Sequence, residues 1–480
     1  MNLNEQPIIL TTQMLKGVRN FQCDCACVTA PAITTADFDC TKSELMCTNV
    51  RIQDLPGGYK LLFNYSDGNG IVVVNPSGLK LWKSYQQPRK SMPVETVWAS
   101  ALLESGVLAQ PQARNLAKVP NTSLDILSAW LHLTDVCNLR CTYCYLPHIK
   151  SKMSFETGQE IVDSIFRSAE INGFKSLLLK YAGGEPLLAF SILKKIQQYA
   201  EKVAAEKNIN LESVVLSNGT LLTQESIDFL KAHQVRLMIS LDGLESAHNA
   251  QRIYAGGKGT FSDVVKGIDL AQKNGLIPDI SITITGNNAD HLPDLMRWIL
   301  QRELPFSLNF YRECDLSSSH SELKLEEEKV ISGVLETYKI IENNLPAQSL
   351  LGALMDRANL SQPHQHTCGV GQNYLVFDPT GQVFKCQMEQ TRPLTTMLAK
   401  DPLQVIRQDQ IGIQNIPVSE KENCNKCNWR HTCAGGCPLV TFRATGRYDL
   451  KSPNCDIYQR LFPEVLRLEG LRLLKYSALL

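Results

Sequence analysis

The chain has 480 residues, 44% of them hydrophobic, and its 48 Lys and Arg side chains equal its 48 Asp and Glu side chains in number. This length predicts two or three domains, and the even charge, with no long run of one sign, gives no support for a nucleic-acid partner. The first residues lack the pattern of a signal peptide and no stretch has about 18 uninterrupted apolar residues, so we expect a cytoplasmic protein with no membrane partner, whose 16 cysteines serve metal or redox chemistry rather than disulfides.

Residues 1–50 show no periodicity, and we expect an irregular segment there. It crowds five cysteines among Thr, Asp and Ala: Cys23, Cys25, Cys27, Cys40 and Cys47. The alternating first three could ligate a metal from one face of an extended segment, but no second group of matching spacing accompanies them. Incidental or redox-labile thiols and metal ligands both remain open as interpretations.

Residues 51–115 change to a pattern of strands and short helices. Apolar runs at 59–65 and 71–74 flank the turn Ser66-Asp67-Gly68-Asn69-Gly70, whose Asp-Gly and Asn-Gly pairs favour a β-hairpin. Two short helical patterns follow. This α+β order resembles the small winged-helix-like domains that recognise leader peptides, and an ordinary N-terminal cap on the next domain is the alternative.

Strand and helix patterns alternate after a polar stretch, residues 111–123, that indicates a linker. We expect strands at residues 129–133, 177–181, 213–216, 236–241, 279–284 and 306–310. A helical pattern trails each strand: the first is capped at Ser154, and the last, near residues 325–343, has a charged face that we expect in solvent. Six βα units predict an α/β fold, a partial (β/α)6 barrel over residues 125–345 with its site at the carboxyl ends of the strands.

Three thiols follow the first of these strands within one short loop: Cys137, Cys141 and Cys144. A four-iron four-sulfur cluster with one iron left open for another ligand needs thiolates on three corners. A zinc knuckle or three unrelated core cysteines are the alternatives, but zinc pairs are usually spaced Cys-x2-Cys twice over. The spacing therefore favours an iron–sulfur cluster at the carboxyl end of the first strand.

Polar residues and glycines follow the next strands, where the barrel would place a binding site. They are Gly183, Gly184, Glu185 and Pro186 after the second strand, Asn218 after the third, Ser240 and Asp242 at the fourth, and Arg252 a short loop further on. The glycines would let the backbone approach a ligand, Glu185 offers a carboxylate for an amine, and Arg252 offers a guanidinium for a carboxylate. Turn formation alone is the alternative explanation for Asn218 and Asp242.

A second set of cysteines fills the last third of the chain: Cys368, Cys386, Cys424, Cys427, Cys433, Cys437 and Cys455. Gly435 and Gly436, next to Cys433, permit tight wrapping around a cluster. A structural zinc ribbon is the alternative, because Cys-x2-Cys alone fits zinc. We assign residues 365–460 to this cysteine domain and residues 461–480 to a C-terminal helix that packs back on the barrel.

The loop Cys137-x3-Cys141-x-Tyr143-Cys144 resembles the hallmark of the radical S-adenosylmethionine (SAM) enzymes, with Tyr143 in the aromatic place. The resemblance implies that the open iron chelates SAM and that one electron cleaves it to methionine and a deoxyadenosyl radical, which abstracts a substrate hydrogen atom. It also implies cofactor contacts from Gly183, Gly184, Glu185 and Pro186 to the amino group, from Ser240 and Arg252 to the ribose and carboxylate, and from Asn218 and Asp242 in the pocket wall.

The seven later cysteines resemble the SPASM domain of radical enzymes, which carries two auxiliary clusters. The resemblance assigns Cys424, Cys427, Cys433 and Cys455 to one cluster and Cys368, Cys386 and Cys437 to the other, and so implies three 4Fe-4S clusters in all. Some relatives supply a fourth thiolate to the second cluster where this chain has Tyr374. That iron is then open to substrate or filled by Cys314 or another group.

Enzymes that resemble this chain over about residues 125–460 mostly act on peptides or proteins. In the sulfatase-maturating branch an aspartate after the second cysteine serves as base, and Gln387 stands here instead, which disfavours that branch. The segments His366-Thr367-Cys368-Gly369-Val370-Gly371-Gln372-Asn373-Tyr374 and Ser452-Pro453-Asn454-Cys455 most resemble maturases of ribosomal precursor peptides with a nitrogen-fixation-type leader. Those include spliceases that excise tyramine to leave an α-keto-β-amino acid.

The expected function is therefore modification of a ribosomal precursor peptide, by tyramine excision or by thioether or carbon–carbon crosslinking into a cyclophane. Expected partners are the peptide, an electron donor such as flavodoxin or ferredoxin, and a separate leader-recognition subunit if the N-terminal domain lacks that role. A non-catalytic iron–sulfur electron carrier is the alternative from another class, and it would leave the Gly-Gly-Glu-Pro motif at residues 183–186 unexplained.

Overall fold

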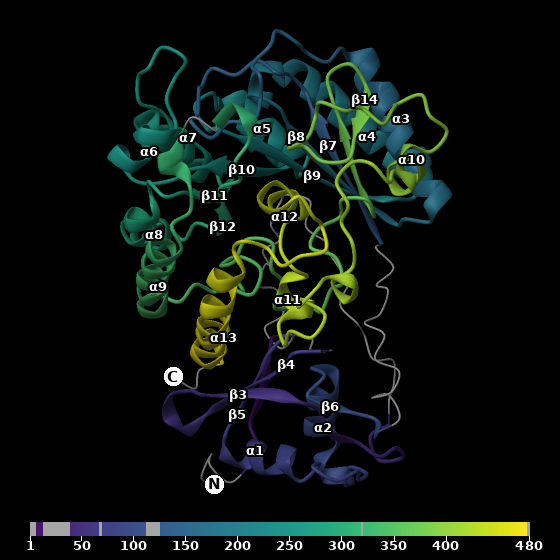
Figure 1. Ribbon diagram of the computed structural model, residues 1–480, viewed down its shortest axis with the longest axis vertical. Coiled ribbons are helices and arrows are strands. Elements are labelled where there is room, and N and C mark those ends of the chain that lie inside the picture. The colour runs from purple at the N-terminus through teal and green to yellow at the C-terminus, as the bar shows by residue number, and fades with distance from the viewer. Residues whose placement is uncertain (1–5, 13–38, 67–69, 112–124, 318–319, 478–480) are drawn as a thin grey trace.

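The computed structural model describes residues 6–12, 39–66, 70–111, 125–317 and 320–477. In Figure 1 an N-terminal unit lies at the bottom, a large sheet with its helices lies at the top, and the helices from Arg430 onward lie between them. Cys23, Cys25 and Cys27 and most of the expected linker at 111–123 lie outside the described residues.

The N-terminal unit is an antiparallel sheet with the strand order β1-β5-β4-β3 and two helices. Its elements are β1 (Ile9–Thr11), β2 (Met46–Cys47), β3 (Val50–Asp54), β4 (Lys60–Asn64), β5 (Val72–Val74), α1 (Pro76–Lys83), α2 (Thr96–Glu104) and β6 (Leu108–Ala109), with short 3-10 helices at Pro56–Gly58 and Pro93–Glu95. The pairing of β4 with β5 confirms the predicted hairpin. Asn75 begins α1 because its side chain accepts the N–H of Gly78 at 2.8 Å.

The prediction of an irregular segment at residues 1–50 was wrong in part. β1 pairs with β5 at the edge of the sheet, and β2 pairs with β6. Strands of three and two residues are too short to show an alternating pattern, so only their partners reveal them. Cys40 and Cys47 are buried in the small apolar core of this unit, where they fill space next to Trp82 and Leu102.

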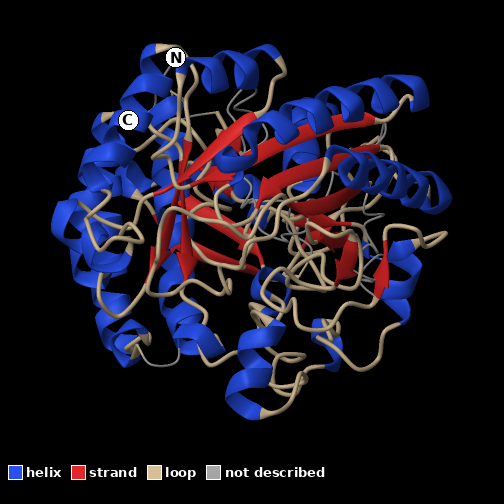
Figure 2. Cartoon of the chain, turned by 90° about the horizontal axis from the view of Figure 1, so that it is seen from above, coloured by secondary structure: helices blue, strands red, loops and turns tan. Residues whose placement is uncertain are grey.

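The large sheet has the strand order β12-β11-β10-β9-β8-β7-β13-β14-β15, and β7 to β12 run parallel, as predicted. The barrel strands are β7 (Ile126–His132), β8 (Ser176–Ala182), β9 (Asn210–Ser217), β10 (Arg236–Ser240), β11 (Asp279–Ile284) and β12 (Phe306–Phe310). Figure 2 shows helices along the outer side of these strands. Strands covered in this way are buried on both faces and read as nearly continuous apolar runs.

The helices that follow these strands are α3 (Phe155–Asn172), α4 (Phe190–Lys207), α5 (Gln224–Ala232), α6 (Glu245–Gln251), α7 (Phe261–Lys273), α8 (Leu292–Gln301) and α9 (Glu327–Asn343). Short 3-10 helices lie at Pro186–Ala189, Ala289–His291, Asp315–Ser317 and Ser321–Leu323. Ser154 caps α3 as predicted, since its side chain accepts the N–H of Thr157 at 3.0 Å. α3 ends at Gly173, whose φ of 74° suits the left-handed cap.

The C-terminal segment contains β13 (Tyr374–Phe377), β14 (Gln382–Phe384), β15 (Thr395–Thr396), α10 (Pro402–Gln408), a 3-10 helix at Val418–Glu420, α11 (Arg430–Cys433), α12 (Pro438–Thr445) and α13 (Cys455–Tyr476). β13 pairs in parallel with β7 and so extends the barrel sheet, which the sequence did not predict. The cysteine domain is thereby joined to the strand that precedes the three-cysteine loop.

α13 lies against α9 of the barrel, as predicted, and also against the N-terminal sheet (Figure 1). Gly470 lets the sheet come close, because a Cβ there would lie 2.9 Å from the side chain of Leu55 and 3.0 Å from that of Leu61. The fully buried Glu469 pairs with Arg472 at 2.7 Å and accepts the N–H of Leu350 at 2.9 Å. One helix thus joins all three parts of the chain.

Candidate active site

The three-cysteine loop leaves β7 at the carboxyl end of the barrel and is held by two neighbouring loops. The N–H of Glu185 donates to Val136 O at 3.0 Å, and the N–H groups of Arg140 and Thr142 donate to Ile253 O and Gln251 O at 2.8 and 2.9 Å. These bonds fix the loop between the turn after β8 and the segment after α6.

Burial raises the pKa of the Cys137 thiol to about 11 and that of the Cys144 thiol to about 12. Without a metal these thiols hold their protons at neutral pH, so ligation must displace protons. Among the described residues no three His, Cys, Asp or Glu side chains are close enough to hold a single metal ion. A four-iron cluster takes each thiolate on a separate iron and does not need such closeness.

The Gly-Gly-Glu turn packs directly on the cysteine loop. Gly183 has a φ of 138°, and a Cβ on Gly184 would collide with the carbonyl oxygen of Val136. The carboxylate of Glu185 is fully buried and accepts the N–H groups of Leu187 at 3.1 Å and Asn218 at 2.8 Å and the hydroxyl of Ser217 at 2.8 Å. Glu185 therefore braces β8 against β9, a function in addition to the predicted amine contact. Pro186 begins the 3-10 helix behind it.

Tyr143, Asp242 and Arg252 form one buried hydrogen-bonded group, which we call the Tyr–Asp–Arg group. The hydroxyl of Tyr143 donates to Asp242 Oδ2 and accepts from Arg252 Nη1. Asp242 Oδ1 accepts the N–H of Thr283 at 2.8 Å, and Arg252 Nη1 lies 3.7 Å from Asp242 Oδ2. Burial raises the pKa of Asp242, while the guanidinium of Arg252 opposes that rise. The group joins the cysteine loop to the end of β10.

Asn218 fixes the loop from the side of β9. Its side-chain N–H donates to Asn138 Oδ1 at 2.9 Å, and Asn138 Nδ2 donates to the hydroxyl of Thr220 at 2.9 Å. Ser240 is the half-buried last residue of β10, two positions before Asp242. The predicted contact residues thus gather around the cysteine loop, and their contacts with a cofactor stay predictions.

Buried donors beside this loop lack partners in the described part of the chain, and they suit SAM. The atoms are Arg252 Nε, Gln251 Nε2 and Thr142 Oγ1. A cofactor that offers a carboxylate, ribose hydroxyls and adenine nitrogens would supply acceptors for such donors. The residues present therefore fit SAM, which Arg252 and Gln251 would contact, and the three thiols would hold the cluster. Gln251 was not predicted, since nothing in its sequence context marks it.

Four cysteines of the C-terminal array line one cavity of about 200 Å³: Cys424, Cys427, Cys433 and Cys455. Trp429, just before α11, and Tyr458, in α13, also line it. We call this the four-cysteine cavity. It contains the set that the resemblance assigned to one auxiliary cluster, although that ligation stays a prediction.

Cys368, Cys386 and Cys437 line a second cavity, which we call the three-cysteine cavity. The same apolar cluster that surrounds these residues includes Trp130 on β7 and Ala182 at the end of β8, so this cavity lies over the carboxyl end of the barrel. The structure thus brings together the members of each of the two cysteine sets, although these members lie far apart in the sequence.

Cys314 was one of the groups considered for the open position at the three-cysteine cavity, and that assignment stays a prediction. Cys314 Sγ lies 3.7 Å from Cys144 O and 3.2 Å from Ser317 Oγ, beside the first cysteine loop, and it does not line the cavity. Tyr374 is fully buried and donates to Gln387 Oε1 at 3.0 Å. Gln387 is therefore an amide acceptor where the sulfatase-maturating branch needs a base.

A buried pair that the sequence did not mark lies between the barrel and the cysteine domain. His132, the last residue of β7, is fully buried with Nε2 at 2.9 Å from Asp135 Oδ1. Gln390 Nε2 lies 3.5 Å from His132 Nδ1. His132 lies in a strand between core residues, so the sequence pattern gives no sign of a functional role for its side chain.

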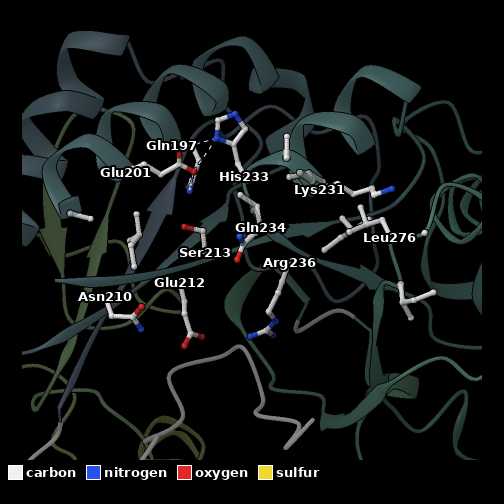
Figure 3. A pocket seen from close by; sticks show the side chains of 18 residues that line it. Gln197, Glu201, Asn210, Glu212, Ser213, Lys231, His233, Gln234, Arg236 and Leu276 are labelled. Atoms are coloured by element: carbon white, nitrogen blue, oxygen red, sulfur yellow. Dashed lines mark hydrogen bonds and ion pairs between the residues drawn. The ribbon is translucent and has the colours of Figure 1, made fainter. Parts of the chain in front are cut away.

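A much larger cavity, of about 860 Å³, lies far from the thiols (Figure 3). It is lined by the amino ends of β9 and β10, whereas the cysteine loops lie at the carboxyl ends. Figure 3 shows His233 beside Gln197 and Glu201, and the His233 Nδ1 to Glu201 Oε2 distance is 2.8 Å. Its volume alone would favour this cavity as the active site, but the cysteine loops lie at the opposite ends of the strands, and we place the active site there.

A partial parallel barrel with a three-cysteine loop after its first strand, and partnerless donors suited to SAM around that loop, defines a radical SAM enzyme. Residues 131–299 match the model of the Radical SAM superfamily. Such a domain works with SAM and a 4Fe-4S cluster. The chain is thus an enzyme with a radical SAM catalytic domain.

Individual proteins are similar over more of the chain. A cysteine-type anaerobic sulfatase-maturating enzyme of Clostridium perfringens is 23% identical over 324 residues, 63% of this chain and 85% of that protein. An uncharacterized protein of Archaeoglobus fulgidus is 26% identical over 356 residues, 70% of this chain and 80% of that protein. A solved structure of native anSMEcpe with bound AdoMet and Cp18Cys peptide has a TM-score of 0.60 at 21% identity, covering 72% of this chain and 99% of that chain, and shares the fold.

In the part of the chain that the structure describes, no helix combines the length and the apolar character that a membrane crossing requires.

Proposed function

We propose that this chain modifies a ribosomally synthesised precursor peptide by radical chemistry, with one SAM-binding cluster and two auxiliary clusters. The observation that carries the proposal is that the cysteines of the three-cysteine cavity pack in one apolar cluster with Trp130 of β7 and with Ala182 at the carboxyl end of β8. A substrate between the barrel and the cysteine domain would meet both redox sites. A structure with the same fold is described as bound to AdoMet and a peptide, which supports a peptide substrate.

The bound cofactor and cluster would supply a deoxyadenosyl radical that abstracts hydrogen from a Cα or Cβ position. Cys137, Cys141 and Cys144 would hold the cluster, and Arg252 would orient the SAM carboxylate through the fixed geometry of the Tyr–Asp–Arg group. The predicted contacts from Gly183 to Pro186, Asn218 and Ser240 complete the pocket. The buried walls exclude water, which protects a radical from side reactions.

The N-terminal sheet, residues 51–115, would bind the leader of the precursor. β3 pairs with β4 on one side only among the described strands, and Ile52 in β3 is 45% exposed. An extended leader can add a strand to such an edge through main-chain hydrogen bonds. α13 then connects this sheet to the four-cysteine cavity through Tyr458. A separate leader-recognition subunit is required only if this sheet lacks that role, and an electron donor such as flavodoxin or ferredoxin completes the proposed partners.

Excision of a tyramine unit, leaving an α-keto-β-amino acid, is the reaction we propose, on the resemblance of the segments around Cys368 and Cys455. Crosslinking begins with the same hydrogen abstraction and is the second candidate. Sulfatase maturation is disfavoured because the buried Gln387 cannot take a proton as a carboxylate can. A pure electron carrier would show no dependence on SAM.

Mass spectrometry of a precursor peptide after anaerobic incubation with SAM and reductant tests this proposal. We expect SAM-dependent loss of the –NH–CH(CH2C6H4OH)– unit, which has two hydrogen atoms fewer than free tyramine, whereas crosslinking would remove only a pair of hydrogen atoms. SAM cleavage without any change in precursor peptides that carry the leader would contradict a peptide-maturase function.

A further inference from the structure

A buried lysine lies beside the four-cysteine cavity without a carboxylate partner. Lys421 is 1% exposed, and its Nζ donates to Ala434 O at 2.7 Å. In the part of the chain that the structure describes, no carboxylate pairs with this ammonium, and the neighbouring Glu420 and Glu422 are exposed. Lysines are almost never fully buried unless their charge is paired. Lys421 therefore needs a negative partner other than an acidic side chain.

Another lysine of the cysteine domain shows the usual arrangement. Lys385 is also buried, and its Nζ lies 3.1 Å from Asp409 Oδ2. Burying a charge costs much free energy unless an opposite charge and good hydrogen bonds compensate for the lost water. The single carbonyl oxygen of Ala434 carries no net charge and cannot replace a carboxylate. The comparison with Lys385 indicates that an anion is missing at Lys421.

The side chain of Lys421 runs directly behind the wall of the four-cysteine cavity. Gly435 lines this cavity, and a Cβ there would lie 2.6 Å from Lys421 Cδ and 2.9 Å from its Nζ, so any side chain at Gly435 would displace the lysine. The carbonyl oxygen of Lys421 accepts the N–H of Asn425 at 3.1 Å, at the start of the turn that carries Cys424. The ammonium is thereby fixed between this turn and the segment that follows Cys433.

The missing anion matches what the four-cysteine cavity would hold. A four-iron four-sulfur cluster with four thiolate ligands carries a net negative charge, and an electron that it accepts adds to this charge. The cavity has a volume of about 200 Å³ and all four thiols in its wall. Burial lowers the pKa of Lys421, and negative charge at Cys424 and Cys433 acts against burial. The residues at this cavity therefore fit a cluster, with Lys421 as its cation.

We propose that Lys421 is the counter-charge of the cluster at the four-cysteine cavity and raises the reduction potential of that cluster. A fixed positive charge that water screens poorly stabilises the reduced, more negative cluster more than the oxidised one. Lys421 acts through the cluster, as a positioning residue does, and its effect is electrostatic. This inference rests on the auxiliary clusters of the proposed function and names the residue that sets the potential of one of them.

A redox titration of the auxiliary clusters tests the proposal without turnover. The parent is the full-length chain with Cys137→Ala, Cys141→Ala and Cys144→Ala, reconstituted with iron and sulfide, reduced stepwise with dithionite and followed by electron paramagnetic resonance. Adding Cys455→Ala to the parent identifies the signal of the four-cysteine cluster, because that signal is lost or altered. In Lys421→Met we expect the one-electron reduction of this cluster to be disfavoured at least tenfold, a fall of about 59 mV or more in its midpoint potential.

Two neutral replacements separate the charge of Lys421 from its hydrogen bond. Lys421→Gln can still donate to Ala434 O, whereas Lys421→Met cannot, so an equal fall in potential in both variants identifies the charge as the cause. Lys451→Met is the matched control, because Lys451 lines the same cavity, but its side chain is 54% exposed and its Nζ lies 3.8 Å from Asp456. Water and salt screen such a charge, so this variant should change the reduction equilibrium by about threefold or less.

An unchanged potential in both Lys421 variants, a fall in Lys421→Met alone, an equal fall in Lys451→Met, or loss of iron from both Lys421 variants would overturn the proposal and leave Lys421 a structural residue. Because neither SAM nor peptide takes part, these results are separate from a failure of the proposed reaction, which mass spectrometry of the precursor reports. Fewer than about eight irons in the parent would contradict the proposed auxiliary clusters themselves, and this inference with them.

Discussion

Removing the Tyr143 hydroxyl should weaken SAM binding while leaving the fold intact. In Tyr143→Phe the ring stays, but Asp242 loses a donor and Arg252 loses an acceptor. A hydrogen bond to a charged group contributes about 1.5–3 kcal/mol. The two charged groups already lie 3.7 Å apart and can partly replace the lost bonds with each other. The net loss is then about 2 kcal/mol, which corresponds to about 30-fold in a dissociation constant.

The measurement is the dissociation constant of SAM for the cluster-loaded enzyme, by anaerobic equilibrium dialysis, with iron content determined on each sample. Tyr254→Phe is the matched control, because the Tyr254 hydroxyl donates to Asp263 at the surface at 2.9 Å, and it should bind SAM within about twofold of wild type. Wild-type affinity in fully loaded Tyr143→Phe would refute the idea that the Tyr–Asp–Arg group orders Arg252 for the cofactor.

Five further outcomes are expected. Cys141→Ala should abolish SAM cleavage measured by chromatography, and retained cleavage would contradict the assignment of the first cluster. Cys433→Ala should keep part of that cleavage but form no modified peptide. If modified peptide still formed, the auxiliary clusters would have a structural role only. Gly184→Ala should lower iron at the first site, because the new Cβ collides with the cysteine loop, and full iron content would show that the loop can yield. Gly470→Val should free the N-terminal sheet from α13 and speed its limited proteolysis, which an unchanged digestion rate would contradict. Because burial raises the pKa of the Cys137 thiol to about 11, its thiolate fraction grows with pH, so iron uptake should rise from about pH 7 to pH 9, and a flat profile would argue against that burial.

The barrel strands could be predicted because each is a local apolar run followed by a helical pattern, and the structure has all of them in the expected order. β1 and β13 could not, because each gains its identity from a partner distant in the chain, β5 and β7. Short strands of this kind are defined by pairing rather than by periodicity.

The residues of the candidate site, too, could be predicted from the sequence only in part. The cysteines and the glycine turn are recognisable from spacing. The bond from Tyr143 to Asp242, the partnerless donor of Gln251 and the burial of Lys421 behind the four-cysteine cavity arise only when separate loops meet. Lysines are common surface residues, so its sequence context does not reveal that Lys421 is buried beside a cavity of thiols.

Iron and labile sulfide per chain, measured on anaerobically reconstituted protein beside the Cys137→Ala, Cys141→Ala, Cys144→Ala variant, test the account most directly. It predicts about twelve irons in the wild type and about eight in the variant, one cluster lost and two retained. About four irons in the wild type, with zinc bound by the C-terminal cysteines, would contradict it, because the two cysteine-lined cavities would then be structural zinc sites.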